Sequence, residues 1–375
     1  MFFIRVKLST FASPKNVIKM IEADINEIDI VKAKKTKIHD VDFNNINFGR
    51  VFTDHMFVCD FIDGKWQQPK IMPYQAMTID PSARVFHYGQ AVFEGMKAYK
   101  DDNGSVFLFR PEDNHSRINK SAARLAIPEF PKAYFMNGLL TLLNLDKDWI
   151  KAGVGNSLYI RPFVIATDSA IAAAPSSNYR FMIICSPAKA YYTGKVRVLI
   201  AEKYSRSADG GVGFAKAAGN YAAQFYPTSL AQAKGFQQII WTDADSHKYL
   251  EEAGTMNIFF RINDTLITAP NNDRILDGIT RKSVIQLAKD NHIEMEVRRI
   301  TVDEIKDAAN KGYLKEIFGT GTAAVISPVS AFEHAGTTYE IPDLDDSYAG
   351  MFKKQLLNIQ HNLSEDKHGW RYPVQ

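Results

Sequence analysis

Stretches typical of β-strands recur along this chain and alternate irregularly with helical segments. The strand-like runs are rich in β-branched and aromatic residues and are bounded by Gly, Pro, Asn or Asp: 51–61, 105–109, 157–166, 181–186, 196–201, 237–243 and 257–263. Helical periodicity occurs in four further segments: 112–126, 135–150, 280–291 and 347–362. Because the alternation is irregular, we predict a mixed α/β (α+β) fold and not a regularly wound sheet.

The length of 375 residues leaves room for two domains with substantial cores. The best boundary is the loop YYTGKVRV, since one predicted strand ends before it and another begins after it. We therefore predict a small α/β domain over 20–192, a linker over 193–204 and a large α/β domain over 205–375. Residues 1–19 are basic and free of acids, and we expect a disordered extension there in preference to a cleaved targeting signal.

Composition excludes several classes of protein. A net charge of +3 and the absence of a basic block with interleaved aromatics argue against nucleic-acid binding. No apolar run approaches the roughly 20 residues that span a bilayer. The two cysteines, Cys59 and Cys185, lie in apolar stretches and are expected to be reduced core thiols of a cytoplasmic protein. There is no HExxH, CxxC or GxxxxGK motif, so we predict no metal site and no nucleotide-phosphate loop of that kind.

One lysine, Lys216, lies among small residues in the stretch GVGFAKAAGNYAA. Glycine and alanine on both sides allow a flat ligand to approach the backbone, and poor solvation favours an uncharged amine. Both properties suit a lysine that forms a Schiff base with a carbonyl group. The alternative is a lysine in a loop that only needs glycine flexibility.

Two further stretches carry groups that would complement such a lysine. In HKYLEEAGTMNIFF, Glu251 and Glu252 precede a tight turn and a strand, which fixes the direction of a carboxylate as a partner for a pyridinium nitrogen requires. In ILDGITRKSV, Gly278 to Thr280 lie at a predicted helix start, where free N–H groups favour a phosphate. The Gly/Thr loop FGTGTAAVISP and Arg117 are further candidates for binding an anion.

Taken in order, these stretches resemble the branched-chain amino-acid aminotransferases, which are pyridoxal-phosphate enzymes of fold type IV. The resemblance extends from about residue 47 to 333 and rests on FGRVFTDHM, HYGQAVFEGMKAY, FRPEDNHSRINKSAARL, SLYIRPFV, GFAKAAGNYA, EEAGTMNIF, LDGITR and FGTGTA. It implies a two-domain fold like that of D-amino-acid aminotransferase, with pyridoxal 5'-phosphate bound by the large domain. It also implies a homodimer, in which a loop near 171–173 closes over the partner's pocket.

The resemblance assigns roles to individual residues. Lys216 looks like the Schiff-base lysine and the base that moves the α-proton, and Tyr221 looks like the partner of the cofactor's phenolate oxygen. Glu252, and not its neighbour Glu251, would pair with the pyridine nitrogen, while Arg117 would bind the phosphate. The other implied cofactor contacts are Thr255, Gly278, Ile279, Thr280 and Thr322.

For the substrates, the resemblance implies an apolar pocket with one arginine. The pocket residues would be Phe48, Tyr88, Phe93, Tyr159 and Tyr191. The substrate's α-carboxylate would meet the turn at Thr322 and Ala323. Arg161 at the rim would bind the γ-carboxylate of glutamate or 2-oxoglutarate without filling the space for leucine, isoleucine or valine. The reaction implied is reversible amino transfer between these amino acids and 2-oxoglutarate.

Mammalian members of the family carry a CxxC pair at positions that are Ala324 and Ser327 here, which excludes a thiol switch at this place. Other enzymes of the same fold, a D-amino-acid aminotransferase or an aminodeoxychorismate lyase, remain alternatives. A nicotinamide dehydrogenase is suggested by GTGTAA, but Ser327 and Pro328 follow where the fingerprint requires a helix. A non-catalytic binding protein would leave Lys216 and Glu252 without a task.

Overall fold

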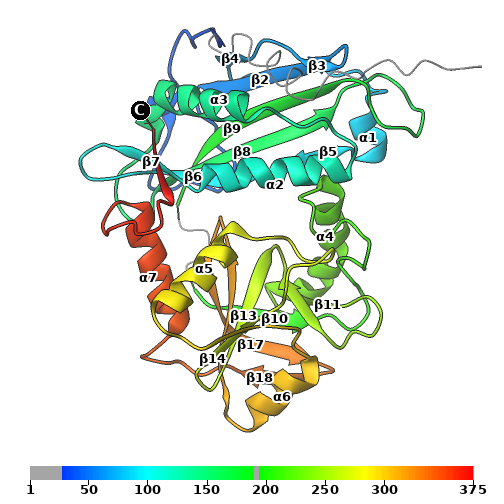
Figure 1. The fold of residues 1–375 in the computed structure, drawn as a ribbon, viewed down its shortest axis with the longest axis vertical. Coiled ribbons are helices and arrows are strands. Elements are labelled where there is room, and N and C mark those ends of the chain that lie inside the picture. Colours follow the sequence, from blue (N-terminus) through cyan, green and yellow to red (C-terminus); the bar gives the residue numbers. More distant parts are fainter. Residues whose placement is uncertain (1–27, 190–193, 375) are drawn as a thin grey trace, which may run out of the picture.

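Two β-sheets organise the computed structural model, which describes residues 28–189 and 194–374. The first sheet, at the top of Figure 1, has the order β1-β4-β2-β9-β8-β6-β7-β19, with β3 beside β2 and β5 beside β8. Its strands are β1 (Asp29–Ile30), β2 (His55–Ile62), β3 (Lys65–Trp66), β4 (Lys70–Pro73), β5 (Ala91–Phe93), β6 (Met96–Lys100), β7 (Val106–Phe109), β8 (Ser157–Ala166), β9 (Tyr179–Ala188) and β19 (Arg371–Val374).

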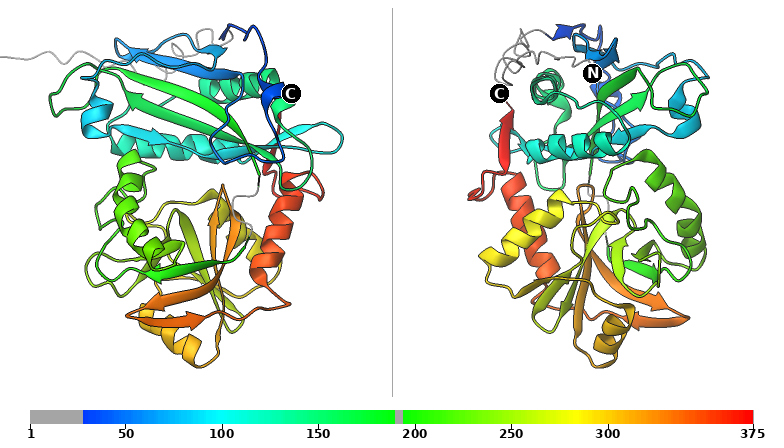
Figure 2. Two further views of the ribbon diagram at one scale, coloured as in Figure 1. Left: turned by 180° about the vertical axis from the view of Figure 1, so that it is seen from behind. Right: turned by 45° about the vertical axis from the view of Figure 1, so that its right-hand side comes forward.

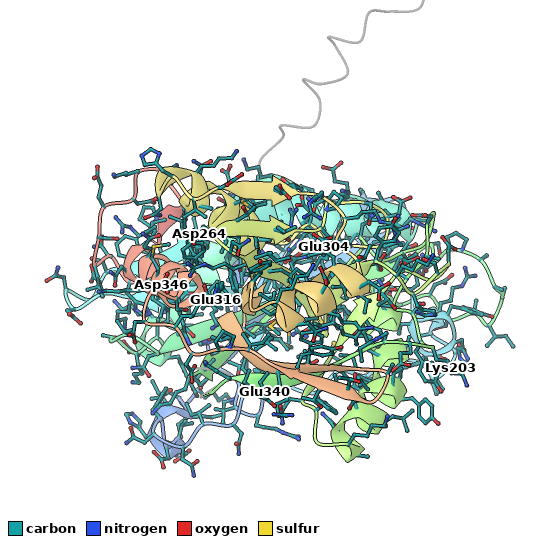
Figure 3. The ribbon with its side chains drawn as sticks, turned by 90° about the horizontal axis from the view of Figure 1, so that it is seen from below. Lys203, Asp264, Glu304, Glu316, Glu340 and Asp346 are labelled. Carbon is teal, nitrogen blue, oxygen red and sulfur yellow. The ribbon has the colours of Figure 1, made fainter. Side chains whose placement is uncertain are left out.

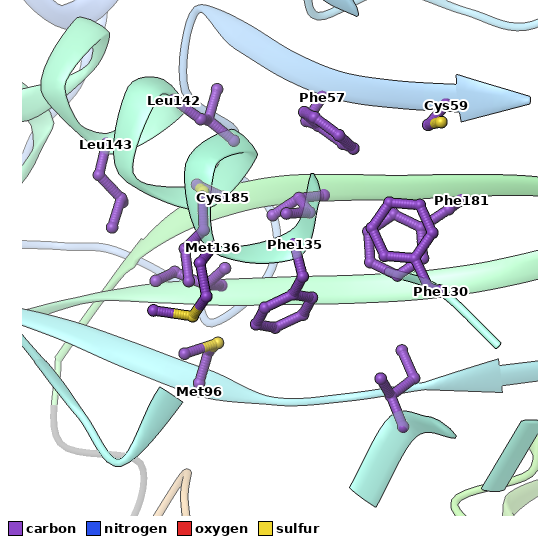
Figure 4. Close-up of a cluster of buried hydrophobic side chains, with 14 of the residues drawn as sticks. Phe57, Cys59, Met96, Phe130, Phe135, Met136, Leu142, Leu143, Phe181 and Cys185 are labelled. Atoms are coloured by element: carbon purple, nitrogen blue, oxygen red, sulfur yellow. The ribbon is translucent and has the colours of Figure 1, made fainter. Parts of the chain in front are cut away.

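Two helices, α2 (Pro111–Arg124) and α3 (Lys132–Leu145), cover one face of the first sheet. Successive residues of a strand point to opposite faces, so Phe57 and Cys59 of β2 enter the core under these helices. In the same core the rings of Phe130 and Phe181 stack with centroids 3.6 Å apart (Figure 4). A Cβ atom on Gly138 of α3 would lie 2.3 Å from the Phe57 ring, so the helix needs a glycine where it contacts the sheet.

The second sheet closes into a barrel. Its order is β12-β11-β10-β17-β16-β13-β14-β15, and a further pairing of β12 with β13 joins β10, β11, β12, β13, β16 and β17 into a six-stranded ring. Closure removes the exposed edges that an open sheet would leave. The strands are β10 (Val196–Ile200), β11 (Gln238–Thr242), β12 (Leu250–Ala253), β13 (Met256–Ile262), β14 (Thr265–Thr268), β15 (Met295–Val297), β16 (Leu314–Gly321), β17 (Val325–His334) and β18 (Thr337–Glu340).

The remaining helices are α1 (Arg84–Tyr88), α4 (Ala218–Ala233), α5 (Ile279–Asp290), α6 (Val302–Asn310) and α7 (Tyr348–Gln360), with short 3-10 turns at Ile38–Asp40 and Lys147–Trp149. Figure 1 shows α4 and α7 on opposite sides of the barrel. No helix among the described residues is long and apolar enough to cross a membrane.

A cluster of ion pairs connects α7 to the barrel. Arg261 of β13 contacts Asp264, Glu316 and Asp346, the three acids seen near one another in Figure 3. Glu316 also accepts a hydrogen bond from the Ser347 hydroxyl at 2.6 Å, and Ser347 caps the first turn of α7. These charges therefore serve the fold.

The predicted mixed α/β class is confirmed, and all four predicted helices occur, as α2, α3, α5 and α7. The helices α1, α4 and α6 were not predicted. The domain boundaries remain predictions. Two segments belong to other sheets than those boundaries suggest. Residues 196–200 of the predicted linker form β10 of the second sheet, and the chain end returns to the first sheet as β19. The predicted extension 1–19 lies outside the described residues.

Candidate active site

A cavity of about 650 Å³ lies where the first sheet faces the barrel. The first sheet and its connections contribute mainly aromatic side chains to it, while the barrel side contributes an amine, a phenol and a loop of small residues. The residues that line it are Phe48, Phe93, Gly95, Tyr159, Arg161, Lys216, Tyr221, Gln224, Phe225, Thr228, Gln232, Gln238, Thr255, Met256, Gly321, Thr322, Ala323 and Ala324. A cavity of this size accommodates a cofactor together with a small substrate.

Lys216 lies two residues before α4 and is fixed by its backbone. Its amide donates to the Ser121 hydroxyl of α2 at 2.9 Å, and its carbonyl accepts from the amide of Phe93 at 3.0 Å. Its ammonium nitrogen lies 2.7 Å from the hydroxyl of Tyr221, in the first turn of α4, and 4.8 Å from the centre of the Phe93 ring. The amine is thus held in the cavity by a phenol and faces an aromatic ring.

Glu252 is a buried carboxylate on β12, and both of its oxygens have polar partners. One oxygen accepts from Asn257 Nδ2 at 2.9 Å and from the Leu276 amide at 3.1 Å, and the other lies 2.8 Å from Arg206. Burial raises the pKa of Glu252, while the charges of Arg206, Lys216 and Arg117 oppose that rise. The charge of Lys216 thus acts on the Glu252 carboxylate.

Glu251, the preceding residue, points to the other face of the strand. It pairs with Arg274, whose Nε lies 2.5 Å from a carboxylate oxygen. Burial raises the pKa of Glu251 to about 7, although Arg274 acts in the opposite direction. The strand period therefore gives the two neighbouring acids different environments.

Arg117 on α2 is held by an acid that was not predicted to take part. Glu94 is fully buried and accepts from Arg117 Nε at 2.7 Å and Nη2 at 2.8 Å, and also from Asn114 at 2.7 Å. Arg117 Nη1 donates to the Asp277 carbonyl at 3.1 Å. A guanidinium has five N–H donors, so two remain for another acceptor.

The N-terminus of α5 lies near the same place. Gly278 precedes the helix, and a Cβ atom there would come 1.8 Å from the Asn257 side chain, so only glycine fits. Ile279 and Thr280 form the first turn and line a small cavity of about 20 Å³ together with Thr322. Free N–H groups at a helix start favour an anion.

The first-sheet wall of the large cavity combines rings with one cation. Arg161 Nη2 donates to the Tyr159 hydroxyl at 2.9 Å, and the guanidinium lies 4.6 Å from the centre of the Phe93 ring. Phe48 meets Tyr159 edge-on with centroids 4.9 Å apart. Arg161 forms no ion pair with any residue that the structure describes. The wall thus offers apolar surface and one available positive charge.

The loop GTGTAA joins two strands, β16 and β17, and no helix follows it. A dinucleotide fingerprint requires a helix at this point. The structure therefore argues against the nicotinamide alternative.

Residues 91–332 match the Amino-transferase class IV family. Branched-chain-amino-acid aminotransferase 2 of Bacillus subtilis (strain 168) is 44% identical over 355 residues, which is 92% of this chain and 96% of that protein. Branched-chain-amino-acid transaminase 1 of the same organism is 46% identical over 307 residues, 80% of this chain and 86% of that one. This chain belongs to the class IV aminotransferases. The resemblance that the motifs indicated is confirmed.

Solved structures agree on the fold. The branched-chain aminotransferase of Thermoproteus uzoniensis with norvaline superposes with a TM-score of 0.72 at 24% identity, covering 86% of this chain and all of that one. The enzyme of Thermobaculum terrenum in its PLP form gives a TM-score of 0.70 at 20% identity, covering 86% and 98%. The predicted fold type IV architecture of this class IV aminotransferase is confirmed.

One predicted pocket residue of this class IV aminotransferase, Tyr88, does not line the cavity. Tyr88 is 45% exposed, and its hydroxyl donates to the carbonyl of Ile171, which ties it to the 171–173 loop. The loop near 171–173 was predicted to close over the partner's cavity. A contact of Tyr88 with a substrate in that cavity stays a prediction. Tyr191 lies outside the described residues.

Sequence reasoning missed two supporting residues, Glu94 and Arg206. Glu94 is a lone acid in the otherwise apolar run AVFEGM, and that isolation was a usable signal. Arg206 lies in SRSADGG, where nothing in the sequence distinguishes it from a loop arginine. Only the fold brings it to Glu252.

Proposed function

We propose that this class IV aminotransferase is a branched-chain amino-acid transaminase that moves an amino group between L-leucine, L-isoleucine or L-valine and 2-oxoglutarate. The observation that carries the proposal is the pairing of Lys216 with Tyr221 inside the cavity, with the buried Glu252 nearby. The names of relatives 44–46% identical to this chain support the same substrates. The reaction corresponds to EC 2.6.1.42.

The residues present fit pyridoxal 5'-phosphate. Its aldehyde carbon needs an amine, its ring nitrogen an acid and its phosphate a set of N–H donors. Lys216 offers the amine, Glu252 the buried acid, and Arg117 with the start of α5 the donors. Gly278 allows the start of α5 to lie against the Asn257 side chain, since a Cβ atom there would collide with it. Thr255 and Thr322 line the cavity and would complete the contacts.

Each residue of this set has a task in the proposed reaction. When bound, pyridoxal phosphate supplies a carbonyl that takes up the amino group and a ring that accepts electrons from the substrate carbon. Lys216 would take the proton from the substrate α-carbon and deliver it to the cofactor carbon that carried the aldehyde, since its amine is confined to the cavity by Tyr221. Arg206 stabilises the negative charge of Glu252. That carboxylate would in turn stabilise a positive charge on the ring nitrogen.

The two substrates would share one pocket. Phe48, Phe93 and Tyr159 provide the apolar contacts for a branched side chain. Arg161 lies beside them and would pair with the γ-carboxylate of 2-oxoglutarate, since it has a positive charge without a described acidic partner. The α-carboxylate common to both would meet the turn at Thr322 and Ala323.

We also propose a homodimer formed by the face of the first sheet opposite α2 and α3. That face carries a second apolar cluster, in which Met56, Val58 and Met182 are buried and Met72, Tyr74, Phe163 and Ile184 are partly buried. An apolar depression of about 260 Å³ adjoins it, and Ile171 nearby on the loop held by Tyr88 is 71% exposed. Apolar surface of this kind favours association. Sedimentation should give a mass of twice 42.2 kDa.

A cytoplasmic location is proposed from the state of the thiols. Cys59 and Cys185 are free and buried, and burial raises the pKa of Cys59 to about 12. Cys59 pairs with Phe181 across β2 and β9, which puts Cys185 four residues away, roughly 13 Å along the strand. A disulfide needs Cα atoms within about 7 Å, so Cys59 and Cys185 do not form one in this fold, as we expect for thiols of a reducing compartment.

The test is an assay of purified protein loaded with pyridoxal phosphate. We expect amino transfer from L-leucine to 2-oxoglutarate and little turnover of D-alanine or aminodeoxychorismate. Lys216→Ala is the inactive control. Preference for D-alanine, or lysis of aminodeoxychorismate, would assign this chain to one of the other activities of the same fold.

A further inference from the structure

A second lysine, Lys97 on β6, is buried beside the same cavity. Lys97 is only 6% exposed, and its ammonium nitrogen donates to the carbonyl of Ala323 at 2.9 Å. Lys97 forms no ion pair within 28–189 and 194–374. Burial lowers the pKa of Lys97 to about 8, so the group stays mostly protonated at pH 7. An unpaired buried ammonium is costly, and one carbonyl offsets only part of that cost.

Ala323 belongs to the turn that joins β16 to β17. Gly321 and Val325 pair across the two strands, which leaves Thr322, Ala323 and Ala324 as the connecting loop. Their three amide N–H groups donate to no residue that the structure describes. All three residues line the large cavity that contains Lys216. Consecutive free N–H groups of this kind form a site for an anion.

Two side-chain contacts fix this turn to the first sheet. The Thr322 hydroxyl donates to the Gly95 carbonyl at 3.1 Å, and Lys97 holds the Ala323 carbonyl. In a trans peptide the C=O and N–H bonds point in opposite directions. With its carbonyl directed at Lys97, the peptide between Ala323 and Ala324 directs its N–H away from the lysine. Because Lys97 lines the small cavity and Ala324 the large one, we expect this N–H on the side of the large cavity.

We infer that Lys97 is a positioning residue for the substrate's α-carboxylate, because it orients the turn at 322–324 and places an uncompensated positive charge behind it. The inference rests on the proposed function and extends it to a residue that contacts no substrate. A carboxylate bound at the turn supplies the missing counter-charge. The same lysine serves amino acids and oxo acids alike, since both carry this carboxylate.

The experiment compares a charged and a neutral ligand of the same shape. Dissociation constants of 4-methylvalerate and 4-methylvaleramide are measured with the pyridoxal-phosphate form of the wild type, Lys97→Met and Lys97→Gln. Lys100→Met is the matched control, since Lys100 on the same strand also donates to a backbone carbonyl, but to that of Lys147 at 2.8 Å and not to the turn at 322–324. Bound cofactor is measured by its visible absorbance in each protein.

We expect Lys97→Met to weaken 4-methylvalerate about tenfold or more and to leave the amide nearly unchanged. Lys97→Gln retains a hydrogen-bond donor for the Ala323 carbonyl and therefore isolates the effect of the charge. If the methionine variant does not fold, the glutamine variant is used to compare the binding of acid and amide. Equal weakening of acid and amide, unchanged binding of both, or a loss confined to the cofactor would overturn the inference. A wild type that does not transaminate L-leucine would instead count against the proposed function, whatever the Lys97 variants do.

Discussion

The two walls of the cavity differ in kind. The wall from the first sheet consists of Phe48, Phe93 and Tyr159 with a single cation, Arg161. The barrel side contributes Lys216 and Tyr221, a turn with free N–H groups, and the buried Glu252 behind them. One wall therefore offers apolar surface with a single charge, and the other offers groups that we propose to move a proton or hold a charge.

This difference separates the chemistry from the choice of substrate. On the barrel side, Glu252 is held by three partners, Asn257, Leu276 and Arg206. Such fixed polar groups stabilise charge in a transition state without reorganising. The rings of the other wall contact one another and give apolar area, whose discrimination between similar side chains is small. Changes on the two walls should therefore have different kinetic signatures.

Glu252→Gln should produce a larger loss than Arg161→Met or Glu251→Gln. Removing the negative charge should slow the half-reaction with L-leucine roughly 10²–10³-fold, the size of losing one fixed charge-stabilising group. The rate of the absorbance change after mixing with L-leucine measures this effect, with bound cofactor checked beforehand. A loss no larger than that of Glu251→Gln would remove the distinction between the two acids.

Arg161→Met should have a selective effect on the opposite wall. We expect the second-order rate constant for 2-oxoglutarate to fall about 10- to 100-fold, as for loss of a hydrogen bond to a charged group. The constant for L-leucine should change little, because its side chain has no carboxylate. Stopped-flow measurement of the two half-reactions separates them. Equal losses for both substrates would mean that Arg161 supports the cavity and does not select.

Glu251→Gln should have the smallest effect on catalysis, about twofold in kcat/KM, since Glu251 faces away from the cavity. Its signature should be in stability. With a folded pKa of about 7 against 4.5 when unfolded, Glu251 binds its proton more tightly in the folded chain. Its contribution to the free energy of unfolding therefore falls as pH rises from about 4.5 to 7. Urea unfolding across this window should show that the variant lacks this fall.

Much of the local structure could be predicted from the sequence. The run 157–166 coincides with β8, and 280–291 with α5 to within one residue, because their periodicity is strong. α4 was missed because Pro227 lies inside it, a residue that ordinarily ends a helix. The closure of the barrel depends on the pairing of β12 with β13, which no local pattern specifies.

The candidate site divides in the same way. Ordered motifs identify Lys216, Tyr221, Glu252 and Arg117 in the sequence, and the structure brings Lys216 and Tyr221 into contact. Their supports come from distant segments: Glu94 lies 23 residues from Arg117 and Arg206 lies 46 residues before Glu252, so only the fold brings them together. Lys97 and Ala323 are separated by 226 residues. Contacts of this range depend on how the two sheets face each other.

The most direct test of the account is the visible absorption spectrum of the protein with pyridoxal phosphate, before and after L-leucine, for the wild type and Lys216→Ala. Lys234→Ala, at the exposed end of α4, is the control. We expect a coloured wild type and control that bleach with L-leucine, and a variant that lacks this band and reacts at least roughly 10²–10⁴-fold more slowly. A protein that stays colourless with the cofactor, or a Lys216→Ala variant with an unchanged spectrum and rate, would contradict the central role of Lys216.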